Sequence, residues 1–264
     1  MKNRKAKNWF SKVKNRLHFD AKVSKKNAMG IVKKENVITH AFFPFIYFEI
    51  KQFKLAKKNL RLEQGIELDP YKIRKIFYSC HSDSYIFSYY NELLLSKYEE
   101  LINSEGLDCC IAYRHIDKNS KGIGKSNIDF AAEAFKEIER RKICYVVGLD
   151  IQKFFDNLDW DILKNNLCKI LNVERLPDDW FQIYKILTKY HYITLDDILH
   201  CKYIKSNRRA FWNNDTHSFD KICSAKTFRR IIKEYPELIK KNELECGIPP
   251  VSYTHLTLPT SDLV

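Results

Sequence analysis

The stretch between residues 145 and 163, YVVGLDIQKFFDNLDWDIL, contains the residues best placed to do chemistry. An apolar, β-prone run ends at Asp150, and the aromatic pair Phe154 and Phe155 follows closely. A carboxylate at the end of a buried strand is rare unless it is paired or holds a metal ion, because burying an isolated charge is costly. Asp150 is therefore the first candidate for a metal ligand.

A strand and two helices are expected to position this stretch. Residues 143–150 (ICYVVGLD) predict a strand, and a helix is expected to begin near Asp159 and to end at about Leu171. Residues 129–140 (DFAAEAFKEIER) have the apolar spacing of an amphipathic helix. Residues 117–127 form a loop by their Gly, Asn and Ser content.

Further upstream, residues 72–78 (KIRKIFY) alternate basic and apolar side chains, which predicts a half-buried strand with a cationic face. The next segment has apolar residues at helical spacing, with Asp83 as its expected cap, and His40 before it is expected to be structural. The other expected elements are a short strand (DCCIAYR) ending at Arg114, a helical region over 178–200 with a break near Thr194, and a helix over 224–242 up to Pro236.

The composition is that of a folded protein with a polyanionic partner. The chain has 264 residues, 45% of them hydrophobic, which suffices for one large domain or two small ones. A formal net charge of +13 favours nucleic acid first and an anionic membrane surface second, because bound lysine and arginine release the counterions of phosphates. The lysine-rich residues 1–35 are either a solvated tail or an arm that contacts phosphates.

The sequence contains no apolar run long enough to span a membrane, and its lysine-rich start lacks the apolar core of a signal peptide. We therefore expect a cytoplasmic protein with no membrane partner. The 8 cysteines form no C-x-x-C pair, and several lie in apolar stretches such as CCIAY and ICYVV. They are better interpreted as reduced core thiols than as metal ligands.

Three motifs, in the same order along the chain, resemble those of reverse transcriptases. The first catalytic motif of that family, D-I-x-x-F-F-D followed by Ile or Leu, is matched by Asp150, Ile151, Phe154, Phe155, Asp156 and Leu158. The fingers pattern K-x-R-x-I with its downstream helix resembles residues 72–76 and the segment after them. Residues 245–250, ECGIPP, resemble the start of the family's G-I-P-Q-G motif.

This resemblance implies an α+β fold that contains the fingers and a partial palm of a right-hand polymerase. It implies two-metal nucleotidyl transfer with two Mg²⁺ ions, or with Mn²⁺ in their place. By resemblance, Asp150 is the catalytic carboxylate and holds the metal together with the main-chain carbonyl of Ile151. Lys72 and Arg74 would bind the nucleotide triphosphate, and Phe155 would lie under the incoming sugar, where it excludes a 2′-hydroxyl.

The resemblance assigns four further residues to template and primer: Arg114, Gly247, Ile248 and Pro249. Simpler roles stay open, because Arg114 suits a structural ion pair equally well, Phe154 suits core packing, and Asp156 suits a turn. Lys72 and Arg74 also suit a solvated strand face. The implied partners are an RNA template, a DNA primer and product, deoxynucleoside triphosphates and a noncoding RNA. HAFFPFI and GKSNIDFAAEAF look most like the defence-associated, abortive-infection group, which implies a role against phage.

The chain departs from the family pattern after residue 249, where Pro250-Val251-Ser252 replaces the expected Gln-Gly. The family's Y/F-x-D-D motif, which supplies the second metal-bridging carboxylate, would follow Gly247, but both Asp-Asp pairs (178–179 and 196–197) precede it. We therefore expect a truncated, inactive fragment with four parts. These are a basic and aromatic N-terminal extension (1–59), the fingers (60–143), a partial palm with a helical insertion (144–249) and a non-native tail (250–264).

Two other functions stay open. An RNA-dependent RNA polymerase also has acidic residues at the spacing of Asp150 and Asp156, but Phe155 argues against it because such an enzyme must admit the 2′-hydroxyl. The other alternative is a non-catalytic nucleic-acid-binding module that keeps the polymerase scaffold.

Overall fold

The structure is a computed structural model that describes residues 9–55, 68–107, 109, 111, 114, 116–118 and 123–249. This part of the chain combines helices and strands, as the sequence predicts. The tail expected at residues 250–264 lies outside the described residues.

The helices of the described residues are α1 (Trp9–Lys12), α2 (Lys25–Ile31), α3 (Lys34–Ile38), α4 (His81–Glu105), α5 (Asn127–Arg141), α6 (Trp160–Leu171), α7 (Asp178–Thr188), α8 (Leu195–Leu199) and α9 (Ala225–Glu234). Two short 3₁₀ helices are η1 (Arg208–Phe211) and η2 (Pro236–Leu238). The strands are β1 (Phe45–Leu55), β2 (Leu68–Tyr78), β3 (His191–Thr194), β4 (Trp212–Asn213), β5 (Ser218–Phe219) and β6 (Lys240–Lys241).

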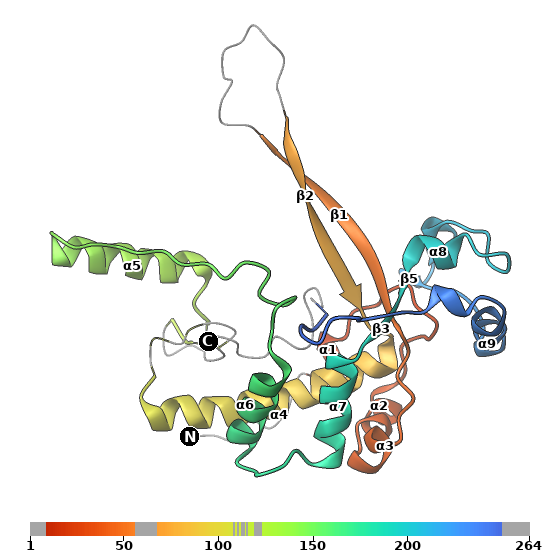
Figure 1. Cartoon of the computed structure of the whole chain (residues 1–264), viewed down its shortest axis with the longest axis horizontal. Coiled ribbons are helices and arrows are strands. Elements are labelled where there is room, and N and C mark those ends of the chain that lie inside the picture. Colours follow the sequence, from red (N-terminus) through yellow and green to blue (C-terminus); the bar gives the residue numbers. More distant parts are fainter. Residues whose placement is uncertain are drawn as a thin grey trace, which may run out of the picture.

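The larger sheet has the strand order β2-β1-β3-β6. β1 and β2 form a long antiparallel hairpin that projects from the rest of the structure (Figure 1), which confirms the strand predicted over residues 72–78. β3 runs parallel to β1 and antiparallel to β6. Alternation along the strands places Tyr47 and Phe77 on one face and Ile46 and Tyr78 on the other, so each face covers a different hydrophobic core.

Helix α4 begins beside the end of β2. Its N-cap is Cys80, whose Sγ accepts the backbone N–H of Asp83, and its C-cap is Gly106 in the left-handed conformation. The prediction that Asp83 caps this helix is wrong, because Asp83 is buried in the first turn. Its carboxylate accepts the backbone N–H of Phe43 at 3.0 Å and contacts His40 Nε2 at 2.7 Å, which confirms a structural role for His40.

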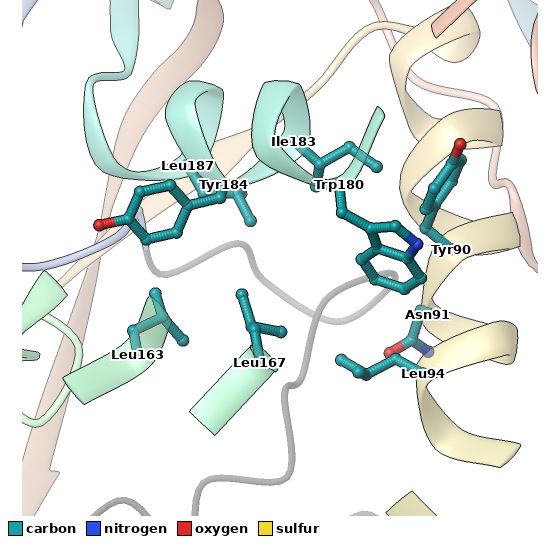
Figure 2. A pocket seen from close by; sticks show the side chains of 9 residues that line it. All are labelled: Tyr90, Asn91, Leu94, Leu163, Leu167, Trp180, Ile183, Tyr184 and Leu187. Carbon is teal, nitrogen blue, oxygen red and sulfur yellow. The ribbon is translucent and has the colours of Figure 1, made fainter. Parts of the chain in front are cut away.

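Helices α4, α6 and α7 pack together beside the sheet. Figure 2 shows how Tyr90, Asn91 and Leu94 of α4 meet Leu163 and Leu167 of α6 and Trp180, Ile183, Tyr184 and Leu187 of α7 around a cavity of about 20 Å³. A space of this size holds at most one water molecule. The predicted helix near Asp159 is confirmed as α6, and the Asp159 carboxylate caps it by accepting the backbone N–H of Asp161 and Ile162.

The strand predicted over residues 143–150 is wrong. These residues form no strand, and the side chains of Ile143, Tyr145 and Leu149 are exposed at 96%, 102% and 92%. In the described part of the chain, no strand pairs with this segment. A β-prone run becomes a strand only when a neighbouring strand takes up its backbone hydrogen bonds, and here that neighbour is missing from the described residues.

Other local predictions have mixed outcomes. The amphipathic helix is confirmed as α5, but Ile128 and Phe135 on it are 79% and 71% exposed, and Figure 1 shows this helix extending away from α4 and α6. The described positions 109, 111 and 114 are not in a strand. The region 178–200 contains β3 between α7 and α8, and the last predicted helix is confirmed as α9.

Cys80 is a buried thiol as expected, whereas Cys109 and Cys144 are exposed, so the core prediction is wrong for those two.

Candidate nucleic-acid interface

The turn that contains Phe155 and Asp156 lies against the segment at residues 246–248. The backbone N–H of Gly247 donates to the carbonyl of Leu158 at 2.7 Å, and that of Ile248 donates to the carbonyl of Phe155 at 2.9 Å. The indole Nε1 of Trp160 donates to the carbonyl of Gly247 at 2.7 Å. Two segments that both resemble polymerase motifs are thus joined by backbone hydrogen bonds, which we name the turn junction.

A glycine is required at the centre of the turn junction. Gly247 has φ of +79°, and a Cβ built on it would lie 2.6 Å from the carbonyl oxygen of Asp156. Glycine adopts positive φ without steric cost and lets the two backbones approach this closely. The sequence G-I-P therefore has a structural explanation that does not depend on any ligand.

The aromatic pair is held at the same place. The rings of Phe154 and Phe155 meet edge to face at 5.4 Å, and both pack half-buried against the core formed with α4, α6 and α7. The packing role expected for Phe154 is confirmed. Asp156 lies in the turn, as expected, and its N–H donates to the carbonyl of Lys153 at 2.9 Å.

Asp150 and Ile151 lie in exposed, irregular chain just before this turn. Among the described residues, Asp150 belongs to no group of three or more His, Cys, Asp or Glu side chains close enough to share a metal ion. The two Asp-Asp pairs lie in the first turns of α7 and α8, where carboxylates interact favourably with the helix dipole. The described residues therefore do not assemble a two-metal centre.

A groove of about 1040 Å³ opens beside the turn junction. It is lined by the turn, the base of the β1–β2 hairpin, β3, β6 and the residues after β6. Its basic lining residues are Lys75, Lys153, His191, Lys240 and Lys241, its aromatic ones are Tyr47, Phe77, Tyr190 and Tyr192, and its acidic ones are Asp156 and Glu243. We call this feature the basic groove. Cationic and aromatic side chains together are typical of surfaces that bind single-stranded nucleic acid.

Two residues that line the basic groove, Tyr190 and Lys240, interact with nearby carboxylates. Burial, with the negative charge of Asp156 nearby, raises the pKa of Tyr190 to about 12, so this ring carries a neutral hydroxyl at physiological pH. Lys240 Nζ lies 3.0 Å from a carboxylate oxygen of Asp197 and 3.1 Å from the hydroxyl of Thr194. Part of the Lys240 charge is therefore balanced within the protein.

Lys72 and Arg74, which the resemblance places on the triphosphate, are not among the described residues that line the basic groove. The backbone of Lys72 pairs with Gln52 in the hairpin, and its side chain lies outside the described residues. Arg74 is exposed, and alternation along β2 places it on the face opposite to Lys75 and Phe77, which line the basic groove.

The residues that the resemblance assigns to template and primer are mostly enclosed by protein. Arg114 donates from Nε and Nη2 to the two carboxylate oxygens of Glu99, both at 3.0 Å, and its side chain is 8% exposed. This geometry favours the structural ion pair. Gly247, Ile248 and Pro249 are buried, and Ile248 packs into the core. These three residues therefore do not line the groove.

The sequence interpretation missed Lys75, Lys153, Lys241, Tyr190 and Tyr192 as candidate binding residues. For Lys75 the signal was present, because alternation in KIRKIFY puts it on the same strand face as Phe77. The two tyrosines were missed because residues 178–200 were expected to be helical with a break near Thr194, whereas His191–Thr194 form β3.

Comparison with protein-family models and with curated proteins finds no match for this chain. None of the helices in the described ranges has the length and apolar character needed to cross a lipid bilayer.

Proposed function

We propose that this chain forms the fingers and part of the palm of a reverse-transcriptase-like, RNA-directed DNA polymerase, and that its basic groove holds the template and primer. The observation that carries the proposal is the turn junction. It brings the D-I-x-x-F-F-D and G-I-P segments into contact, although Asp156 and Cys246 are 90 residues apart in the sequence. Motifs that matched a polymerase only by sequence order thereby lie together beside one groove.

The chemistry of the groove supports a nucleic-acid ligand. Lys75, Lys153 and Lys241 supply positive charge for backbone phosphates, and Tyr190 and Tyr192 supply rings on which bases stack. Stacking on an aromatic side chain contributes about 1–3 kcal/mol per base. The formal net charge of +13 favours association with any polyanion, so specificity must come from the groove.

A binding assay tests this part of the proposal. We expect a fluorescent RNA template annealed to a DNA primer to bind the protein with an affinity that falls steeply as salt increases. Replacing Lys75, Lys153 and Lys241 with Glu should reduce the salt slope by about 2–3, since each phosphate contact contributes about 0.9.

The matched control changes the charge equally but at another place. Lys136 on α5 and Lys226 and Lys233 on α9 are exposed and are not groove-lining residues, so their replacement with Glu should leave most of the affinity intact. Equal losses in the groove variant and in the control variant would mean that binding depends on net charge alone, and the groove would be rejected as the site.

The metal chemistry that the resemblance implies does not fit the described residues as they stand. Two Mg²⁺ or Mn²⁺ ions need bridging carboxylates, and Asp150 lies exposed and in no group of three or more candidate ligands among the described residues. We therefore propose nucleotidyl transfer only for a protein in which a further carboxylate joins Asp150. Deoxynucleoside triphosphates, a noncoding RNA and a role in defence against phage belong to that same proposal.

A non-catalytic nucleic-acid-binding module is the second candidate, and the exposed position of Asp150 is the observation that favours it. Primer extension with the product of the complete gene separates the two. A polymerase should lose extension when Asp150 is replaced with Asn and should begin to accept ribonucleotides when Phe155 is replaced with Ala. Failure to extend any primer would favour the binding module, and free use of ribonucleotides by the unmodified protein would favour an RNA polymerase.

A further inference from the structure

A second cluster of chemically active side chains lies away from the basic groove, where the segment between α1 and α2 meets the start of α4. One ring nitrogen of His18, a carboxylate oxygen of Asp20 and the Sγ of Cys80 all lie within 4.8 Å of one another. His18 and Cys80 are completely buried, and the Asp20 side chain is 19% exposed. The cluster is thus enclosed on most sides and joins residues that are 60 positions apart (80 − 20).

His18 has a buried polar atom that the protein does not satisfy. Its Nδ1 accepts the backbone N–H of Phe19 at 2.8 Å, whereas its Nε2 is buried without a hydrogen-bond partner. A backbone hydrogen bond to Pro44 acts on the ring and raises the His18 pKa, although no bond of normal geometry reaches Nε2. Because Nδ1 accepts a hydrogen bond, Nε2 carries the proton of the neutral ring, and Nδ1 is the nitrogen whose lone pair a metal ion could take.

The protonation of the cluster suits a metal ion. Burial lowers the pKa of His18 to about 3, against the opposing effect of the Asp20 charge, so the imidazole is neutral. A metal ion would take the Nδ1 lone pair in place of the Phe19 N–H. Burial and the nearby carboxylates raise the pKa of the Cys80 thiol, and a bound divalent cation would reverse this by stabilising the thiolate. One carboxylate and one thiolate together balance the charge of a divalent cation.

We propose that His18, Asp20 and Cys80 bind a zinc ion that fastens the segment between α1 and α2 to the start of α4. A set of one sulfur, one nitrogen and one oxygen ligand is characteristic of zinc, whereas Mg²⁺ and Ca²⁺ prefer oxygen ligands alone. Zinc is commonly four-coordinate, and the exposed edge of Asp20 leaves room for a water molecule as the fourth ligand.

The hydrogen bonds of the cluster explain only part of it without a metal. The Asp20 carboxylate accepts four hydrogen bonds, from the backbone N–H and Nδ1 of His81 and from the backbone N–H and hydroxyl of Ser82. These bonds tie Asp20 to the first turn of α4, and none of them involves His18. On zinc binding, the Ser82 hydroxyl is the group expected to leave the carboxylate, and it already lies 3.0 Å from Cys80 Sγ.

Replacing Cys80 with Ser separates the zinc site from a purely structural cluster. Serine is a preferred N-cap residue, so α4 keeps its cap and the variant should fold, but the thiolate ligand is lost. Replacement of the exposed Cys144 with Ser removes a thiol without touching the cluster and serves as the control.

We expect the untagged protein, loaded with zinc and dialysed against zinc-free buffer, to retain about one zinc ion per chain by elemental analysis. The Cys144→Ser variant should retain the same amount, and the Cys80→Ser variant should retain less than about a tenth of it. With Co²⁺ in place of zinc, a thiolate-to-cobalt charge-transfer band should appear in the unmodified protein and be absent from Cys80→Ser. Unmodified protein without stoichiometric metal, or a Cys80→Ser variant that retains as much zinc, would overturn the proposal.

Discussion

Replacing Gly247 with Ala should destabilise the protein strongly, because this residue combines positive φ with the close approach at the turn junction. An L-residue in the left-handed region costs about 1–2 kcal/mol. The added Cβ would also lie 2.6 Å from the carbonyl oxygen of Asp156 and 3.0 Å from that of Phe155. Because both neighbours are backbone atoms, the segments must separate, which weakens the hydrogen bonds of Gly247 to Leu158 and of Ile248 to Phe155.

The magnitude follows from these two contributions. Two weakened hydrogen bonds are worth about 0.5–1.5 kcal/mol each, so the total loss of unfolding free energy is about 2–5 kcal/mol. Gly106 provides the matched control, since it has φ of +66° but would place its Cβ with no atom within 4 Å. Gly106→Ala should therefore cost only the conformational part, about 1–2 kcal/mol.

Urea unfolding of the two variants and the unmodified protein, followed by circular dichroism, measures both losses. The difference between the variants isolates the contact between the two segments, because the backbone strain is common to both. Equal losses for Gly247→Ala and Gly106→Ala would refute the turn junction as a close backbone contact.

Two further predictions concern a buried hydrogen bond and a half-buried thiol. Tyr90→Phe should lower the unfolding free energy by about 1–3 kcal/mol. The Tyr90 hydroxyl donates at 2.7 Å to the buried carboxylate of Asp179, whose other oxygen has no partner. As the control, Tyr145→Phe removes the hydroxyl of an exposed ring and should leave the unfolding free energy unchanged. An equal effect of both changes would contradict the buried hydrogen bond. In alkylation at pH 8, exposed Cys144 should react quickly. Burial raises the pKa of the Cys223 thiol to about 11. This thiol should therefore react only as the pH of the solution approaches that pKa. Mass spectrometry of the labelled peptides measures both rates, and rapid labelling of Cys223 at pH 8 would show that its burial is wrong.

Much of the secondary structure could be predicted because its causes are local. The alternation in KIRKIFY predicts β2, and the spacing of apolar residues with Asp159 as N-cap predicts α6. The amphipathic pattern of α5 is equally visible, although nothing in the pattern tells whether its apolar face is covered.

The predictions that failed depend on partners far away in the sequence. The run at 143–150 has the composition of a strand, but a strand needs a neighbour, and in the described ranges none pairs with it. Asp83 resembles a cap by its position, yet its carboxylate bonds to His40 and Phe43, about 40 residues earlier. The cluster of His18, Asp20 and Cys80 follows no ligand spacing in the sequence, so only the fold brings it together.

Charge and resemblance predicted a nucleic-acid site, but the residues that the resemblance assigns to metal, nucleotide, template and primer are not among the described residues that line the basic groove. Which side chains line the basic groove depends on the parallel pairing of β3 with β1. Because β3 has only 4 residues, the sequence does not reveal this pairing.

The most direct test of the polymerase proposal is a long-read sequence of the source DNA across codons 240–264 and several hundred bases beyond. The polymerase proposal predicts a reading frame that continues after Pro249 into Gln-Gly, a helix that carries Ser, and an aromatic-x-Asp-Asp hairpin. Such a hairpin would supply the strand that the segment 143–150 lacks and a second carboxylate for Asp150. A frame that ends at Val264 as written would contradict the catalytic proposal and leave a nucleic-acid-binding module.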